Sequence, residues 1–392
     1  MTRTTKIILA IGVLIILAAV AVGLAFYLLG GEDGTLSGRR AFLFFPGGGD
    51  AGTGGGTDSA DTDAGDGSTD IAAVAVLSQI VKEPVVGPAL SKDETKILYY
   101  KRAGGNLFRA GLDGQGEDNV SNLTIVGITD VEWSRDRERT IVSYIEDGAL
   151  KRFIQTVATT TTAFLPQNIS APQFSPDATN RIAYTEVTAS GSRLVIADSR
   201  GKNPKTAYSN QIPDFRPSWD EPSTIILSTP PTYAVSSLSV LVTVGKTSSG
   251  FVSGAGLGVL SDNQGSLYAV NAVSSNTGRI LPLRLVNRKG ETVAETGVAT
   301  LADKCAWDTA GEWLYCSVPT NAGAGFPDDW YKGRVQFSDR LVKIDSRTGN
   351  ALELGAETPF IDAVNLFLDT KNQYLFFVNK TDSTLWRLEL GR

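Results

Sequence analysis

The chain has 392 residues, of which 42% are hydrophobic and 20% charged, and its formal net charge is −6. It contains no histidine, which excludes Ser-His-Asp and Cys-His catalysis and histidine metal sites. Two cysteines are too few for a thiolate metal cluster. We therefore expect no metal and no cofactor. Because no basic run stands out beyond the N-terminal flank, we also expect no nucleic-acid partner.

An uncharged apolar segment covers residues 7–29. At ~1.5 Å per residue it is long enough to cross a hydrocarbon core of ~30 Å, which predicts a transmembrane helix. Two basic residues precede it and an acidic pair follows, so residues 1–6 are expected in the cytoplasm and the rest outside. The sequence thus predicts a single-pass protein of the plasma (inner) membrane with a periplasmic or cell-surface domain. The alternative is a long signal peptide cleaved near Ala19–Ala21.

Residues 30–70 are expected to form a linker. Residues 47–70 contain almost only Gly, Asp, Thr, Ser and Ala, which bury too little apolar surface to offset the entropy of ordering and so predict a flexible tether. The aspartates there do not follow a calcium-loop pattern, which favours a solvated linker over a metal site. Ahead of them, the aromatic patch Phe42–Phe45 could lie at lipid headgroups or pair as an isolated strand.

The rest of the chain, residues 71–392, repeats itself. The clearest unit, Ala171–Lys202, has an apolar strand end, a Ser-Pro-Asp turn and two further strands. Aligned on the end of the first strand, the units are spaced by 43, 41, 45, 41, 47 and 61 residues. Four-stranded units with a period of about 40–50 residues predict an all-β fold, a seven-bladed β-propeller. The seven aligned positions are Leu90, Trp133, Phe174, Trp219, Leu260, Trp307 and Leu368.

The two ends of the repeat region complement each other. After Leu368 the pattern shows strands at about Tyr374–Val378 and Thr384–Leu390, which leaves the seventh blade one outer strand short. Before the first blade, Ala72–Ile80 reads as a strand without a blade of its own. We therefore expect this N-terminal strand to close the last blade and with it the ring.

These units resemble the TolB-like propeller repeats, which are distantly related to WD repeats. The resemblance rests on the turn Phe174–Asp177, its relatives Trp133–Asp136 and Leu90–Asp93, and the strand start Ile182–Tyr184. It implies a propeller that binds proteins or other envelope components outside the inner membrane, and it implies no catalysis by itself. TolB also has an extra N-terminal domain and no permanent anchor, so its specific role is not implied.

The cysteines flank the first turn of the sixth blade. If a hairpin pairs Trp307 with Leu314, Cys305 lies directly opposite Cys316, close enough for a disulfide. Outside the cytoplasm an even number of cysteines favours the bonded form. Two buried free thiols and a redox pair are the alternatives.

The 61-residue spacing locates an insertion between the second and third strands of the sixth blade. Its aromatic and charged side chains suit recognition of a protein or glycan partner. The alternative is a loop that only caps the hydrophobic end of its blade. Tyr233, in the corresponding loop of the fourth blade, is expected on the same face. The candidate binding residues of the insertion are Phe326, Asp328, Asp329, Trp330, Tyr331 and Lys332.

Three functions remain open from the sequence. The first is a non-enzymatic binding or scaffold module for a protein or envelope component, with no catalytic residues and no convergent carboxylate pair in the central channel. The second is a carboxylate-dependent hydrolase of glycans, lactones or peptides, which needs two acids about 5–10 Å apart in a pocket. The third is a structural subunit of a cell-surface assembly.

Overall fold

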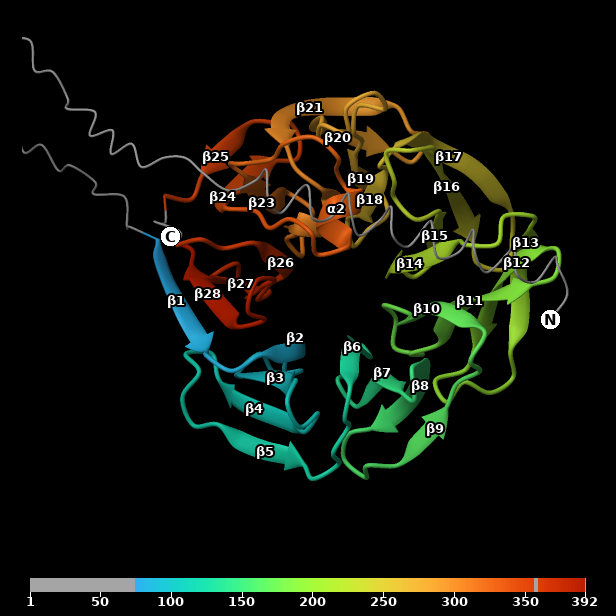
Figure 1. The fold of residues 1–392 in the computed structure, drawn as a ribbon, viewed down its shortest axis with the longest axis vertical. Coiled ribbons are helices and arrows are strands. Elements are labelled where there is room, and N and C mark those ends of the chain that lie inside the picture. Colours follow the sequence, from blue (N-terminus) through green and yellow to red (C-terminus); the bar gives the residue numbers. More distant parts are fainter. Residues whose placement is uncertain (1–74, 356–358, 392) are drawn as a thin grey trace, which may run out of the picture. The chain divides into compact units, whose positions relative to one another are not determined.

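The structure, a computed structural model, describes residues 75–355 and 359–391. Within them the strands form seven antiparallel sheets of four strands, arranged as blades in a ring (Figure 1). This confirms the predicted all-β seven-bladed propeller. Blades one to three comprise β2 (Val85–Leu90), β3 (Lys96–Lys101), β4 (Leu107–Gly111) and β5 (Asp118–Ser121); β6 (Ile128–Trp133), β7 (Arg139–Glu146), β8 (Ala149–Thr156) and β9 (Thr162–Phe164); and β10 (Ile169–Phe174), β11 (Ile182–Thr188), β12 (Gly191–Ala197) and β13 (Lys205–Asn210).

The remaining blades follow in the same order, with the innermost strand first. Blades four and five comprise β14 (Arg216–Glu221), β15 (Thr224–Ser228), β16 (Ser236–Thr243) and β17 (Ser248–Ala255); and β18 (Gly258–Ser261), β19 (Leu267–Asn271), β20 (Pro282–Asn287) and β21 (Thr292–Ala299). Blades six and seven comprise β22 (Cys305–Trp307), β23 (Trp313–Pro319), β24 (Asp339–Asp345) and β25 (Ala351–Glu353); and β26 (Ala363–Leu368), β27 (Tyr374–Asn379), β28 (Leu385–Glu389) and β1 (Val76–Val81). Two short helices, η1 (Ala302–Lys304) and α2 (Asp328–Tyr331), precede β22 and β24 respectively.

The ring closes through the N-terminal strand, as expected. The last blade has the order β1-β28-β27-β26, and β1 pairs antiparallel with β28 through Leu77 opposite Leu388 and Ser78 opposite Arg387. In Figure 1, β1 lies on the outer edge of the sheet that holds the C-terminal strands. The strand begins at Val76, later than the sequence suggested, and the expected residues 72–74 lie outside the described part of the chain.

The innermost strands end at the positions used to align the repeat or within two residues of them. Trp133 and Phe174 are buried at the ends of the innermost strands of blades two and three, and Trp219 is buried near the end of that of blade four. The hydrophobic clusters run between blades: Trp133 packs in one cluster with Tyr100 of blade one, and its indole N–H donates to Gly87 O at 2.7 Å. Each sheet therefore buries a face only against its neighbour, which is why the repeat must form a ring.

The repeated turn after the innermost strand is held by its aspartate. In blade two the Ser134 hydroxyl donates to Asp136 at 2.6 Å, and the Glu138 N–H donates to the same carboxylate at 3.0 Å. Asp136 also accepts the side-chain amide of Asn180 in the next blade at 2.7 Å. The Ser-x-Asp pattern thus shapes one turn and ties two neighbouring blades together.

Among residues 75–355 and 359–391, no helix is long and apolar enough to cross a membrane. The expected transmembrane helix at 7–29 and the linker at 30–70 both lie outside the described residues.

Candidate functional site

The two ends of the propeller carry different connections. Because the strands of a blade are antiparallel, the turns after the innermost strands lie at one end, which we call the turn end. The connections between second and third strands lie at the opposite end, the loop end. The insertion of blade six belongs to the loop end, together with the loop that contains Tyr233.

The insertion, residues 320–338 between β23 and β24, forms a lid that contacts neighbouring blades. Asp328 accepts the Thr232 hydroxyl at 2.8 Å and the Tyr233 N–H at 2.9 Å, both from blade four. The lid backbone also reaches blade five, where Phe326 N donates to Gly278 O at 3.0 Å. Figure 1 shows α2 at the inner side of the ring. Two residues that the sequence singled out separately, Asp328 and Tyr233, are therefore direct partners.

The predicted binding residues divide into a buried and an exposed group. Phe326 and Trp330 are each only 3% exposed and pack with Leu301 and Phe337 in a hydrophobic cluster of the protein itself. These two of the predicted binding residues therefore pack inside the protein and cap the end of the blade. The other predicted binding residues are exposed or partly exposed: Asp328, Asp329, Tyr331 and Lys332 on the lid, and Tyr233 on the loop of blade four.

A cluster of charged side chains lies beneath the lid. Lys304, at the end of η1, has its Nζ 2.6 Å from Asp362 Oδ1 and 2.8 Å from Asp339 Oδ2. Trp330 donates its indole N–H to Asp362 Oδ2 at 2.8 Å. Burial raises the pKa of Asp339 to about 6, against the opposing effect of the Lys304 ammonium. No local pattern in the sequence predicts this cluster, because its members are far apart in the chain.

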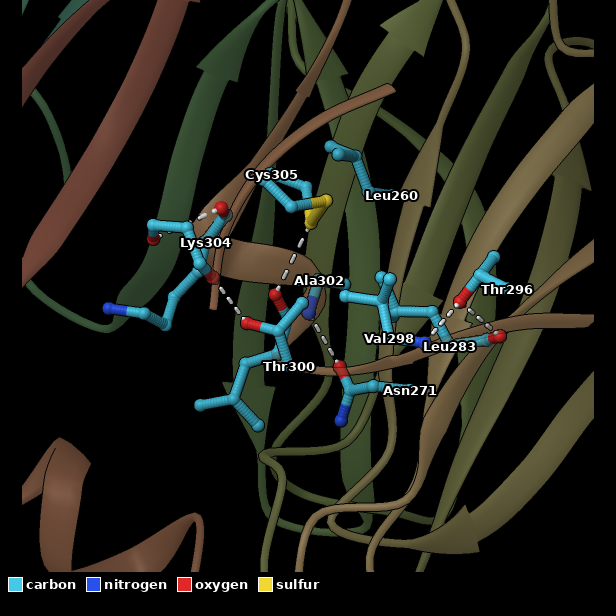
Figure 2. The surroundings of a disulfide bond; sticks show 12 residues. Leu260, Asn271, Leu283, Thr296, Val298, Thr300, Ala302, Lys304 and Cys305 are labelled. Carbon is cyan, nitrogen blue, oxygen red and sulfur yellow. Dashed lines mark hydrogen bonds between the residues drawn. A yellow bond between two sulfur atoms is a disulfide. The ribbon is translucent and has the colours of Figure 1, made fainter. Parts of the chain in front are cut away.

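Cys305 and Cys316 form a disulfide in the structure, with Cα atoms 4.1 Å apart. They face each other in the register of β22 and β23, and both are buried. Figure 2 shows that the side chains of Cys305 and its neighbour Lys304 point in different directions. The Cys305 side chain therefore lies in the core between blades, and the Lys304 side chain lies in the charged cluster under the lid.

A cavity of about 450 Å³ opens between blades seven, one and two. It is lined by the innermost strands β2, β6 and β26 and by residues of the turns that follow β2 and β6, so it lies toward the turn end, away from the lid. The innermost strand β2 bulges at Gly87, which has φ +56°. A Cβ there would lie 2.5 Å from Val131 Cβ, so only glycine allows β2 and β6 to approach this closely.

Carboxylates from two blades act on the pKa of Glu132. Burial, reinforced by the charges of Asp130 and Asp220 and opposed by Arg137, raises the pKa of Glu132 to about 8. Burial also raises the pKa of Asp130, against the charge of Arg152. It raises the pKa of Asp220 too, although the Ser218 hydroxyl donates to that carboxylate at 2.5 Å. A protonated Glu132 beside two other acids can donate or accept a hydrogen bond near neutral pH.

Two acids, Asp130 and Glu132, lie two residues apart on β6. Asp130 and Glu132 both line the cavity, and residues two apart on a strand lie about 7 Å from each other. They project from the same wall, whereas glycosidase acids stand on both sides of the scissile bond. Within the described part of the chain, no group of three or more His, Cys, Asp or Glu residues could hold a metal ion.

Comparisons with known proteins give distant similarities. No protein-family model and no curated protein matches the chain. Among solved structures, TolB from Acinetobacter baumannii aligns with a TM-score of 0.39 and 13% identity over 53% of this chain and 53% of its own. A eukaryotic initiation factor aligns with a TM-score of 0.43 and 10% identity over 76% and 71% of the two chains. The tricorn protease aligns with a TM-score of 0.37 and 14% identity over 75% of this chain and 28% of its own.

The alignment with TolB spans about half of the length of either protein. All three TM-scores are below 0.5. The assignment of a seven-bladed propeller rests on the strand pairing of the structure itself.

Proposed function

We propose that the chain is a membrane-anchored, extracytoplasmic propeller that binds a protein partner without catalysing a reaction. The observation that carries the proposal is the cavity at the turn end, about 450 Å³ in volume and lined by Asp130 and Glu132. A pocket of this size can receive one or two side chains of another protein. The apolar segment 7–29 and the linker 30–70 would keep the propeller near the membrane.

Lys92 and Arg135 also line the cavity, but the two acids on β6 favour a partner that presents a basic side chain. Arg137 donates to Leu90 O at 3.0 Å and to Ser134 O at 3.2 Å, so its guanidinium is engaged with the backbone. Asp130 and Glu132 line the same cavity, and a Lys or Arg brought between them would favour the ionised form of Glu132 and pair with both carboxylates. The exposed lid residues Tyr331 and Lys332 offer a second surface at the other end.

The experiment is crosslinking in intact membranes followed by capture of the propeller and identification of the bound protein. The channel is tested with the pair Asp130→Asn and Glu132→Gln, and the lid with Tyr331→Ala and Lys332→Ala, all of which leave the backbone intact. Loss of the partner from the channel variant alone supports the proposed site. Loss from the lid variant alone transfers the site to the loop end, and capture of the same proteins by both variants and the wild type refutes both surfaces.

The membrane anchor is tested separately. Alkaline extraction leaves a protein with an uncleaved helix in the membrane pellet, whereas a protein cleaved near Ala19–Ala21 is released. The N-terminal peptide of the purified protein, identified by mass, distinguishes the two forms directly.

A second candidate function is a carboxylate-dependent hydrolase. One observation favours it: the pKa of Glu132 is raised to about 8, and Asp130 and Asp220 contribute to this shift. Such enzymes use a protonated acid together with an ionised one. Turnover of a glycan, lactone or peptide substrate that is abolished by Glu132→Gln would establish this function in place of the first.

A further inference from the structure

The three ionisable groups beneath the lid are completely enclosed. The side chains of Lys304, Asp339 and Asp362 all have 0% relative exposure. Lys304 Nζ lies 5.0 Å from the ring centroid of Trp330 and 5.2 Å from that of Phe337. Placing ions in such surroundings costs several kcal/mol for each ion, so a reaction that removes two charges is favoured there.

The two carboxyl groups have different partners. Asp362 Oδ1 faces Lys304 Nζ at 2.6 Å, while Oδ2 accepts the Trp330 indole N–H at 2.8 Å and the Phe337 backbone N–H at 3.1 Å. Two donors on one carboxyl oxygen stabilise negative charge that develops on it, as the donors of an oxyanion hole do.

Asp339 is suited to carry a proton. Its Oδ2 lies 2.8 Å from Lys304 Nζ and accepts the backbone N–H of Ala363 at 2.7 Å. Because burial raises the pKa of Asp339 to about 6, this carboxyl can take up and release a proton near neutral pH. The nucleophile Lys304 therefore contacts both the electrophile Asp362 and the proton carrier Asp339.

We propose that Lys304 and Asp362 are joined by an intramolecular isopeptide bond between Nζ and Cγ, formed with Asp339 as proton carrier. A proton first passes from the Lys304 ammonium to the Asp362 carboxylate, which gives a neutral amine and a neutral acid. The nitrogen lone pair attacks Cγ, a C–N bond forms, and Oδ2 takes the negative charge against its two donors. Asp339 accepts a proton from the nitrogen and returns it to Oδ1, the Cγ–Oδ1 bond breaks, and water leaves. One water is lost and no atom is oxidised or reduced.

The bond would join two neighbouring blades. Lys304 directly precedes β22 of blade six, and Asp362 directly precedes β26 of blade seven. The amide oxygen retains the donors of Trp330 and Phe337, so the lid stays seated over the new bond. Together with the disulfide inside blade six, the bond would make this side of the ring resistant to opening.

The test is peptide mapping of the full-length wild-type chain, denatured, reduced and digested with trypsin. The bond blocks cleavage after Lys304 and joins residues 290–332 to residues 348–371, with a mass one water below the sum of the two peptides. Cleavage after Lys304 together with a free 348–371 peptide would overturn the proposal. A link from Lys304 to residues 335–340, which contain Asp339, would overturn the choice of Asp362 as the acceptor.

Variants test the proton carrier. Asp339→Asn keeps the shape of the side chain, and we expect it to reduce the linked peptide at least tenfold although Lys304 and Asp362 remain. The control is Asp369→Asn, another buried aspartate in the same tryptic peptide, which should keep the wild-type amount. An undiminished amount in Asp339→Asn, in a protein shown to be folded by its circular dichroism, would contradict the role of Asp339.

Discussion

Replacing Glu132 by glutamine should stabilise the propeller at alkaline pH and leave it unchanged in acid. The pKa of Glu132 is raised from its usual 4.5 to about 8 in the folded protein, first by burial and then by the charge of Asp130. Between these two values the folded state holds a proton that the unfolded chain has released. The free energy of unfolding of the wild type therefore falls as the pH rises, by up to about 1.4 kcal/mol per pH unit.

The size of the effect follows from the shift. From 4.5 to about 8 the loss reaches at most about 5 kcal/mol. Because Glu132 is partly exposed to water in the channel, we expect about half of this, ~2 kcal/mol, in the measured difference. Glutamine has the same shape without the charge, so the variant should lose none of this stability as the pH rises.

The assay is urea unfolding of the wild type and Glu132→Gln between about pH 4 and about pH 8, followed by tryptophan fluorescence. Glu138→Gln, an exposed glutamate in the turn of the same blade, serves as the control and should follow the wild type. The difference between Glu132→Gln and the wild type should vanish near about pH 4 and grow through neutrality. Parallel unfolding midpoints for the two proteins across this range would refute the reasoning.

Three further predictions concern the fold. Replacing Cys305 and Cys316 by alanine removes a disulfide that spans a sequence separation of 11. The free energy of unfolding in urea should fall by about 3 kcal/mol. A wild-type unfolding midpoint that does not change on reduction would contradict this prediction. Gly87→Ala places a Cβ 2.5 Å from Val131 Cβ and should lower the free energy of unfolding by roughly 2–4 kcal/mol. The control Gly148→Ala should cost clearly less, because Gly148 also has a positive φ but a Cβ there meets nothing within 4 Å. Deleting residues 76–81 removes β1 and should lower the melting temperature and expose β28 to proteolysis, whereas deleting residues 51–56 of the linker should change neither.

The sequence determined the architecture because the repeat is local. The period of about 40–50 residues, the Ser-x-Asp turn and the apolar end of each innermost strand are short-range features, and a small sheet can bury its faces only against a copy of itself. The strand pattern also indicated that a strand ahead of the first blade completes the last one, and β1 does so by pairing with β28. The pairing of Cys305 with Cys316 was accessible for the same reason, since both lie in one hairpin.

The candidate sites depended on contacts that only the tertiary structure brings together. The sequence included Phe326 and Trp330 among the residues suited to bind a partner, but both rings are buried. Whether an aromatic side chain on a loop faces solvent or the core depends on where the loop folds back. Lys304, Asp339 and Asp362 come from three separate positions in two blades, and Glu132 and Asp220 from blades two and four. No local pattern marks such residues, because a charge alone on a strand gives no sign of the charges that the ring will place beside it.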